Sequence, residues 1–156
     1  MAESNLHVTL KFLGRIEDAR VDAIAAALRT VAARSPAFEI DVRGLGAFPT
    51  PGRPRVIWAR LEPATPLAQL AGDVDGALDA LGFARETRPF AAHVTLGRVR
   101  ESRRNPKLAD ALARPAECGR LSVRRLSLMR SDLHPRGARY TELTSVLLAG
   151  AGSPVE

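Results

Sequence analysis

The chain has 156 residues, of which 46% are hydrophobic and 4% aromatic, so it fits one domain with a core of Ala, Leu and Val and excludes general disorder. It has no apolar run long enough for a membrane span, no secretory pattern at its start and only one cysteine, Cys118, which together favour a cytoplasmic protein without membrane contact or disulfides. The formal net charge of +6 is carried almost wholly by arginine, which suits an anionic partner such as RNA but equally a solvated basic surface.

The first 35 residues predict a strand followed by a helix. In "LHVTLK" (6–11) apolar and polar residues alternate, which is typical of a half-buried strand, here ending at Gly14. Apolar residues recur at helical spacing in "EDARVDAIAAALRTVAARS" (17–35), and acidic residues occupy its first turn. The sequence therefore predicts a helix directly after the strand.

The middle of the chain predicts two strands and a second helix. Alternation returns in 37–48, "PTPGRP" (49–54) predicts a turn-rich loop, and "RVIWARLE" (55–62) predicts the next strand. The segment 65–82 begins with a Thr cap and a proline in its first turn and stops at a glycine, as a helix does.

The last third repeats this succession. We expect a strand over 88–100, a short helix near 105–113, and strands near 119–130 and 138–148. With the first half this gives an α+β fold.

One tetrapeptide occurs twice. His-Val-Thr-Leu stands at 7–10 and again at 93–96, each time followed by a helix, a strand, a loop and a strand. We therefore expect one duplicated, bilobal domain spanning 1–156 with an approximate two-fold axis and two antiparallel sheets flanking a central cleft, with the helices outside. The first lobe would cover about 1–62, the second about 84–150, with 55–82 as the connecting strand and helix.

The symmetry of the repeat also predicts something about the first lobe. A strand and a helix precede His93, whereas only six residues precede His7. We expect an incomplete first lobe with an uncovered sheet edge, which favours self-association or completion by a neighbouring subunit.

The repeated motif carries chemistry. In a strand, residues i and i+2 point to the same side about 6.6 Å apart, so His7 would accompany Thr9, and His93 would accompany Thr95, while Leu96 would point inward. One neutral and one protonated imidazole can act as general base and general acid, while the hydroxyls bind phosphoryl oxygens. A single His-x-Thr is more often an ordinary surface strand; its duplication at corresponding places favours function.

Motifs for other chemistry are missing from the sequence. One Cys and three scattered His do not make a zinc pattern, and there is no phosphate-binding Gly-x-x-x-x-Gly-Lys-[Ser/Thr] loop. We therefore expect neither a metal site nor a cofactor.

"NLHVTLKFLG" (5–14) and "RPFAAHVTLGRVR" (88–100) resemble the two motifs of the 2H phosphoesterase superfamily, in wording closest to the RNA 2′,3′-cyclic phosphodiesterases once called 2′-5′ RNA ligases. "SLMRSDLHPRGARYTEL" (127–143) is similar to their C-terminal segment. The resemblance implies metal-independent hydrolysis of a 2′,3′-cyclic phosphate to a 2′-phosphomonoester. It implies that His7 is the proton donor and His93 the proton acceptor.

The same resemblance implies that Thr9 and Thr95 bind the phosphate. Members of the family normally begin with a strand and a helix that this chain omits, and often have proline where Ala92 stands.

Two arginines are further candidates for substrate binding. Arg98 would face away from Thr95 in an ideal strand, but a bulge at Gly97 would turn it toward the cleft, where it would clamp phosphate. Arg130 lies before the "SDLHPRG" turn and could contact an RNA backbone. An exposed surface role is the alternative for both.

Aromatic side chains are candidates for base stacking. Phe48 lies in the expected loop "GAFPTPG", where ligand contacts concentrate, and Tyr140 lies in the last strand. Packing in the core or at its rim is the alternative for both. We expect Trp58 to pack in its strand and His134 to be exposed in a turn.

Two alternatives to hydrolysis of RNA ends stay open. The chain would be an RNA- or nucleotide-binding module with the same cleft and little turnover, or a phosphodiesterase for small cyclic nucleotides. The sequence does not choose between RNA ends and small nucleotides that bear a 2′,3′-cyclic phosphate.

Overall fold

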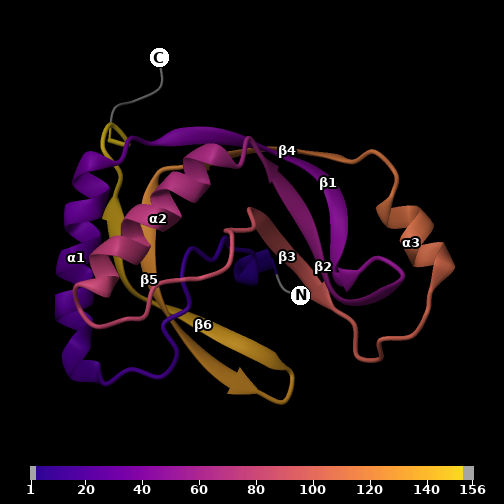
Figure 1. Ribbon diagram of the computed structural model, residues 1–156, viewed down its shortest axis with the longest axis horizontal. Coiled ribbons are helices and arrows are strands. Elements are labelled where there is room, and N and C mark those ends of the chain that lie inside the picture. The colour runs from indigo at the N-terminus through magenta and orange to yellow at the C-terminus, as the bar shows by residue number, and fades with distance from the viewer. Residues whose placement is uncertain (1–2, 153–156) are drawn as a thin grey trace. The chain divides into compact units, whose positions relative to one another are not determined.

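The computed structural model describes residues 3–152 and has the predicted α+β composition, with antiparallel sheets and few helices (Figure 1). It divides into two compact units. Unit 1 contains the chain up to Thr9, Glu39–Thr65 and Ala91–Leu121, and unit 2 contains the remaining described residues. Each unit is assembled from three separate segments of the chain.

Unit 1 is built on a four-stranded antiparallel sheet. Its strand order is β3-β2-β1-β4, with β3 at one edge. The strands are β1 (Phe38–Thr50), β2 (Arg53–Glu62), β3 (His93–Arg98) and β4 (Glu117–Val123). The helix α3 (Pro106–Leu112) begins with a side-chain cap, because Asn105 Oδ1 accepts a hydrogen bond from the Leu108 N–H at 3.0 Å.

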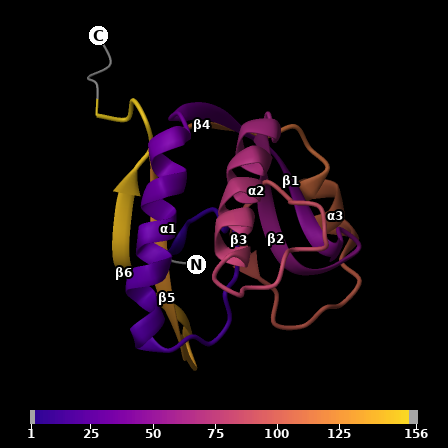
Figure 2. The same cartoon turned by 60° about the vertical axis from the view of Figure 1, so that its left-hand side comes forward.

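Unit 2 packs two helices with a long hairpin. The helices are α1 (Val21–Arg34), preceded by the 3-10 turn η2 (Asp18–Arg20), and α2 (Thr65–Asp79). The hairpin joins β5 (Arg125–His134) to β6 (Gly137–Leu147), and α1 packs against both strands (Figure 2). The apolar stripes that predicted both helices are the buried ones, and they form one core with β5: Ile24, Leu28, Val31, Leu70, Val74, Leu78, Leu126 and Leu128.

The predicted first strand is wrong. The segment 6–10 does not form a strand and follows the 3-10 turn η1 (Glu3–Asn5). Alternating residues form a strand only when a neighbouring strand supplies hydrogen-bond partners, and no ladder between described residues includes this segment. Leu10, one of the apolar residues of this alternation, still packs against the core of unit 2.

Three other boundaries differ from the sequence prediction. The expected loop 49–54 is a tight hairpin, because β1 continues to Thr50 and β2 starts at Arg53. The single strand expected over 119–130 is split into β4 and β5 at Arg124. The second motif strand is shorter than 88–100 and covers only β3.

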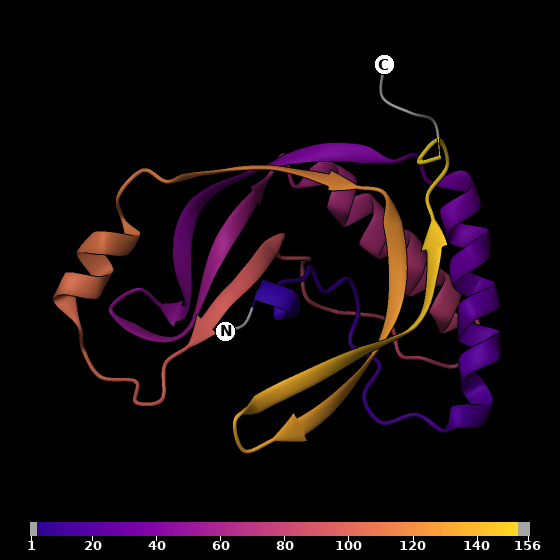
Figure 3. The same cartoon turned by 180° about the vertical axis from the view of Figure 1, so that it is seen from behind.

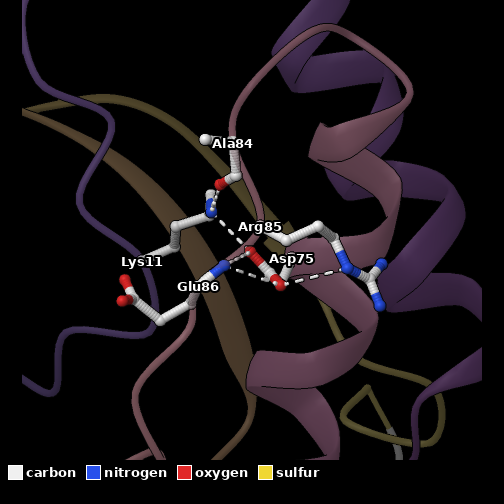
Figure 4. Close-up of polar contacts among 5 residues, drawn as sticks. All are labelled: Lys11, Asp75, Ala84, Arg85 and Glu86. Atoms are coloured by element: carbon white, nitrogen blue, oxygen red, sulfur yellow. Dashed lines mark hydrogen bonds and ion pairs between the residues drawn. The ribbon is translucent and has the colours of Figure 1, made fainter.

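The side chain of Lys11 is largely buried in unit 2. Sequence alternation had grouped its side chain with His7 and Thr9, but it is only 6% exposed and forms an ion pair with Asp75 of α2 (Figure 4). Its ammonium also donates to the Ala84 carbonyl at 2.7 Å.

Asp75 is the centre of this network. Besides Lys11, it accepts from the Glu86 N–H at 3.2 Å and lies 3.6 Å from the Arg85 guanidinium (Figure 4). The hydrogen bond from Lys11, followed by that from Glu86, lowers the pKa of the Asp75 carboxyl from its usual value of 3.8. The network joins the segment after the first motif to α2 and to the loop 83–86.

Within residues 3–152, no helix is long and apolar enough to cross a membrane.

Candidate active site

The two motif histidines are held in the same way. The ring Nδ1–H of His7 donates to the Asn5 carbonyl at 2.6 Å, and that of His93 donates to the Ala91 carbonyl at 2.7 Å. In both cases the acceptor is the backbone two residues earlier. A bond of this kind orients the imidazole and selects its tautomer, so that Nε2 is the nitrogen that exchanges protons.

Both histidines belong to unit 1, together with Thr9 and Thr95. Figure 3 shows η1, which directly precedes the first motif, beside β3, the strand that begins with His93. The Leu6 N–H donates to the Glu3 carbonyl at 3.0 Å, which closes this turn. The fold therefore brings the two copies of the motif into one compact unit.

The second motif lies on one face of the unit 1 sheet. His93 pairs with Arg60 and Thr95 with Trp58 of β2. Paired residues of adjacent strands share a face, so His93 and Thr95 share theirs with Trp58. The opposite face is the packed one: Val94 pairs with Ala59, which is 1% exposed.

Arg98 lies on the same sheet face as His93. The pairing passes from Trp58–Thr95 to Ile57–Gly97, which leaves Leu96 as an extra residue in β3, and Arg98 then pairs with Val56. Val56 and Trp58 are two residues apart on β2 and share a face, so this bulge brings Arg98 to the side of Thr95.

The sequence had placed the bulge at Gly97 and Leu96 in the interior. The bulge instead occurs at Leu96, and its side chain is 36% exposed because the extra residue leaves the regular alternation.

Two aromatic rings surround His93. Phe48 meets the imidazole edge-on, with ring centroids 5.3 Å apart and planes at 87°, and Trp58 lies 6.2 Å away. Phe48 and Trp58 also contact each other at 5.2 Å. The indole of Trp58 lies against Gly46, where a Cβ would come within 2.3 Å of the ring. Glycine at this position is what lets the indole approach β1.

The sequence assigned Phe48 to a loop, but it lies in β1 and is 39% exposed. Trp58 does pack in its strand as predicted, but its position beside His93 was missed. The alternation in "RVIWARLE" could have indicated this position, because neighbouring residues of a strand point to opposite faces and Trp58 therefore lies on the face opposite to Ile57. The indole Nε1–H is buried without an acceptor among the described residues, which is uncommon for a polar group in a folded protein.

Arg130 and Tyr140 belong to unit 2 and lie on opposite faces of its hairpin. Arg130 pairs with Thr141, and Tyr140 pairs with Ser131, so the two side chains are one position out of step. The Arg130 guanidinium lies 3.8 Å from Asp132. The two residues predicted to bind substrate therefore do not form one surface on this hairpin.

His134 is exposed at the end of β5, as predicted. Among residues 3–152, no three His, Cys, Asp or Glu side chains are grouped so that they would hold a metal ion.

An α+β chain with antiparallel sheets and paired His-x-Thr motifs has the features of a 2H phosphoesterase. The family model described as "2'-5' RNA ligase superfamily" matches residues 1–135, and this chain belongs to that superfamily. It is 39% identical over 141 residues to an RNA 2',3'-cyclic phosphodiesterase of Archaeoglobus fulgidus, covering 89% of this chain and 77% of the relative. A protein of the same name from Aeropyrum pernix is 35% identical over 153 residues, with 96% and 86% covered.

Solved structures show the same fold. TT0787 of Thermus thermophilus matches with a TM-score of 0.75 and 30% identity, over 93% of this chain and 79% of that protein. Escherichia coli LigT complexed with 3'-AMP matches with a TM-score of 0.75 and 26% identity, over 95% and 79%.

Proposed function

We propose that this protein hydrolyses the 2′,3′-cyclic phosphate at the 3′ end of RNA to a 2′-phosphomonoester, with His7 and His93 as general acid and general base. The observation that carries the proposal is the matched pair of Nδ1 tethers on His7 and His93 within one compact unit. Relatives that are 30–39% identical carry the name of this activity.

In this reaction the neutral Nε2 of His93 accepts a proton from water, and the water oxygen attacks phosphorus. The bond between phosphorus and the 3′-oxygen breaks, and Nε2 of His7 gives its proton to that oxygen. One water is consumed, the 2′-ester bond remains, and no redox or metal step is required. The next turnover needs only return of the proton from His93 to His7 through solvent.

Other residues of the two motifs and their neighbours bind the phosphate and the base. Thr9 and Thr95 donate hydroxyl hydrogen bonds to the non-bridging oxygens, and the Arg98 guanidinium lies on the same face as Thr95 and neutralises their charge. Phe48 is partly exposed beside His93 and offers a ring on which the terminal base can stack. Contributions of Arg130 and Tyr140 stay predictions.

The test is hydrolysis of an oligonucleotide ending in a 2′,3′-cyclic phosphate, with chelator present and the product phosphate position determined. We expect His7→Ala and His93→Ala each to lower kcat roughly 10²–10⁴-fold, the usual contribution of an acid or base. His134→Ala is the matched control and should retain full activity, since this histidine is exposed at a hairpin end. Equal rates for all four proteins would overturn the proposal, and tight RNA binding without product would favour a binding module.

A further inference from the structure

A cavity of about 260 Å³ lies in unit 1 next to the end of β3. It is lined by Arg55, Arg98, Val99, Arg100 and Ser102. Three of these five residues are arginines, and one of them, Arg98, also lies on the sheet face of His93 and Thr95. Arg98 therefore links the cavity to the proposed catalytic face.

The charge of this cavity is not neutralised by the protein. Arg55, Arg98 and Arg100 form no ion pair with any carboxylate in the part of the chain that the structure describes. Many other arginines do have a carboxylate partner: Arg43, Arg60, Arg85, Arg103, Arg120, Arg125 and Arg130. Three arginines around one cavity supply a set of guanidinium donors suited to phosphate oxygens.

The wall of the cavity is fixed before any ligand binds. The loop after β3 is tied to β2 by the Val99 N–H, which donates to the Arg55 carbonyl at 2.9 Å. The Ser102 hydroxyl donates to the Arg53 carbonyl at 3.2 Å. A third bond runs from the Asn105 N–H to the Gly52 carbonyl at 3.4 Å, just before α3. A preorganised site loses less conformational entropy when a ligand binds.

The distance from the catalytic face indicates the size of the ligand. His93 and Arg98 pair with Arg60 and Val56, which are four residues apart on β2, so at about 3.3 Å per residue they are about 13 Å apart along the strand. The long side chain of Arg98 bridges this distance toward the cyclic phosphate, whereas Arg55 and Arg100 lie beyond the last pair of β2 with β3. Since Arg98 contacts the cyclic phosphate, Arg55 and Arg100 are left for a second phosphate, so a ligand that occupies both the catalytic face and the cavity is a chain with more than one phosphate.

We propose that this cavity binds an internal phosphodiester of the RNA strand, on the 5′ side of the nucleotide whose cyclic phosphate lies at His7 and His93. The proposal rests on the proposed function and extends it: the preferred substrates are RNA ends and not small cyclic nucleotides. A nucleoside 2′,3′-cyclic phosphate reaches Arg98 but gains nothing from Arg55 and Arg100.

The experiment compares two substrates, a nucleoside 2′,3′-cyclic phosphate and a tetranucleotide ending in a 2′,3′-cyclic phosphate. For the wild type we expect kcat/KM to be at least about tenfold higher for the tetranucleotide, the effect of one or two charge-assisted hydrogen bonds. In the double variant Arg55→Ala/Arg100→Ala this ratio should fall about tenfold. The salt dependence of KM for the tetranucleotide should also weaken, by about 0.7 in log–log slope for each phosphate that the variant no longer neutralises.

Arg29→Ala/Arg114→Ala is the matched control, because it removes the same charge from two exposed positions outside the cavity. A ratio near one in the wild type, or the same change of ratio in both double variants, would overturn the subsite. No turnover of either substrate would overturn the proposed function instead. Fluorescence anisotropy with a labelled tetranucleotide ending in a 2′-phosphate then still tests the cavity, since only Arg55→Ala/Arg100→Ala should bind it more weakly.

Discussion

The ring of Phe48 meets the imidazole of His93 edge-on, at a centroid separation of 5.3 Å and an interplanar angle of 87°. This contact joins β1 to β3 across β2, the strand that pairs with both. The orientation of His93 thus depends on a strand 45 residues earlier as well as on its own tether to Ala91.

Removing the Phe48 ring tests its part in substrate binding. We expect Phe48→Ala to raise KM for an RNA 2′,3′-cyclic phosphate roughly 10- to 100-fold, because base stacking on an aromatic side chain contributes about 1–3 kcal/mol. Phe48→Tyr should restore binding, since it keeps the aromatic face. Phe12→Ala is the control, because that ring is 80% exposed and belongs to unit 2. An unchanged KM for Phe48→Ala would contradict the stacking role.

The hydroxyl of Thr95 can be removed without changing the shape of β3. We expect Thr95→Val to lower kcat/KM roughly 10- to 100-fold, because a hydrogen bond to a charged group contributes about 1.5–3 kcal/mol. Thr95→Ser keeps the hydroxyl and should recover most of the activity. Steady-state kinetics on a nucleoside 2′,3′-cyclic phosphate measures both. If Thr95→Ser is as slow as Thr95→Val, packing and not hydrogen bonding is what Thr95 supplies.

A methyl group at Gly46 would displace Trp58. The added Cβ would lie 2.3 Å from the indole, so we expect Gly46→Ala to lower the free energy of unfolding by about 1–3 kcal/mol, as overpacking does. Gly52→Ala is the control, since no heavy atom lies within 4 Å of a Cβ there. Urea denaturation followed by tryptophan fluorescence reports both stability and the environment of Trp58. Equal midpoints for the two variants would show that the indole adapts.

The carboxylate of Asp75 makes stability depend on pH. Since Lys11 and Glu86 hold the pKa of Asp75 below 3.8 in the folded protein, the carboxylate stabilises the fold at pH values above 3.8. That contribution is lost as the pH falls through the lowered pKa. The difference in thermal midpoint between wild type and Asp75→Asn should therefore be largest near neutrality and shrink below pH 3.8.

Asp73→Asn is the control for this measurement, because it changes an exposed carboxylate on the same helix. A midpoint difference between wild type and Asp75→Asn that stays constant from neutrality to about pH 2.5 would contradict the role of the ion pair.

The sequence by itself determined the elements whose patterns are local. The helical spacing of apolar residues determined α1 and α2, and the repeated His-Val-Thr-Leu identified the two motifs and pointed to the superfamily. These features depend only on residues close together in the chain, within one helical turn or two positions of a strand. Such local patterns can be read from a single sequence.

The tertiary structure decided whatever depends on the register between strands. Pairing with β2 makes Leu96 an extra, bulged residue, and this turns Arg98 to the face of His93. The register of β5 with β6 places Arg130 and Tyr140 on opposite faces of the hairpin. The segment 6–10 alternates like a strand but finds no pairing partner among the described residues. A side chain's face is set by which residue lies opposite it, and a shift of one residue reverses that face, so residues distant in the chain decide which groups share a site.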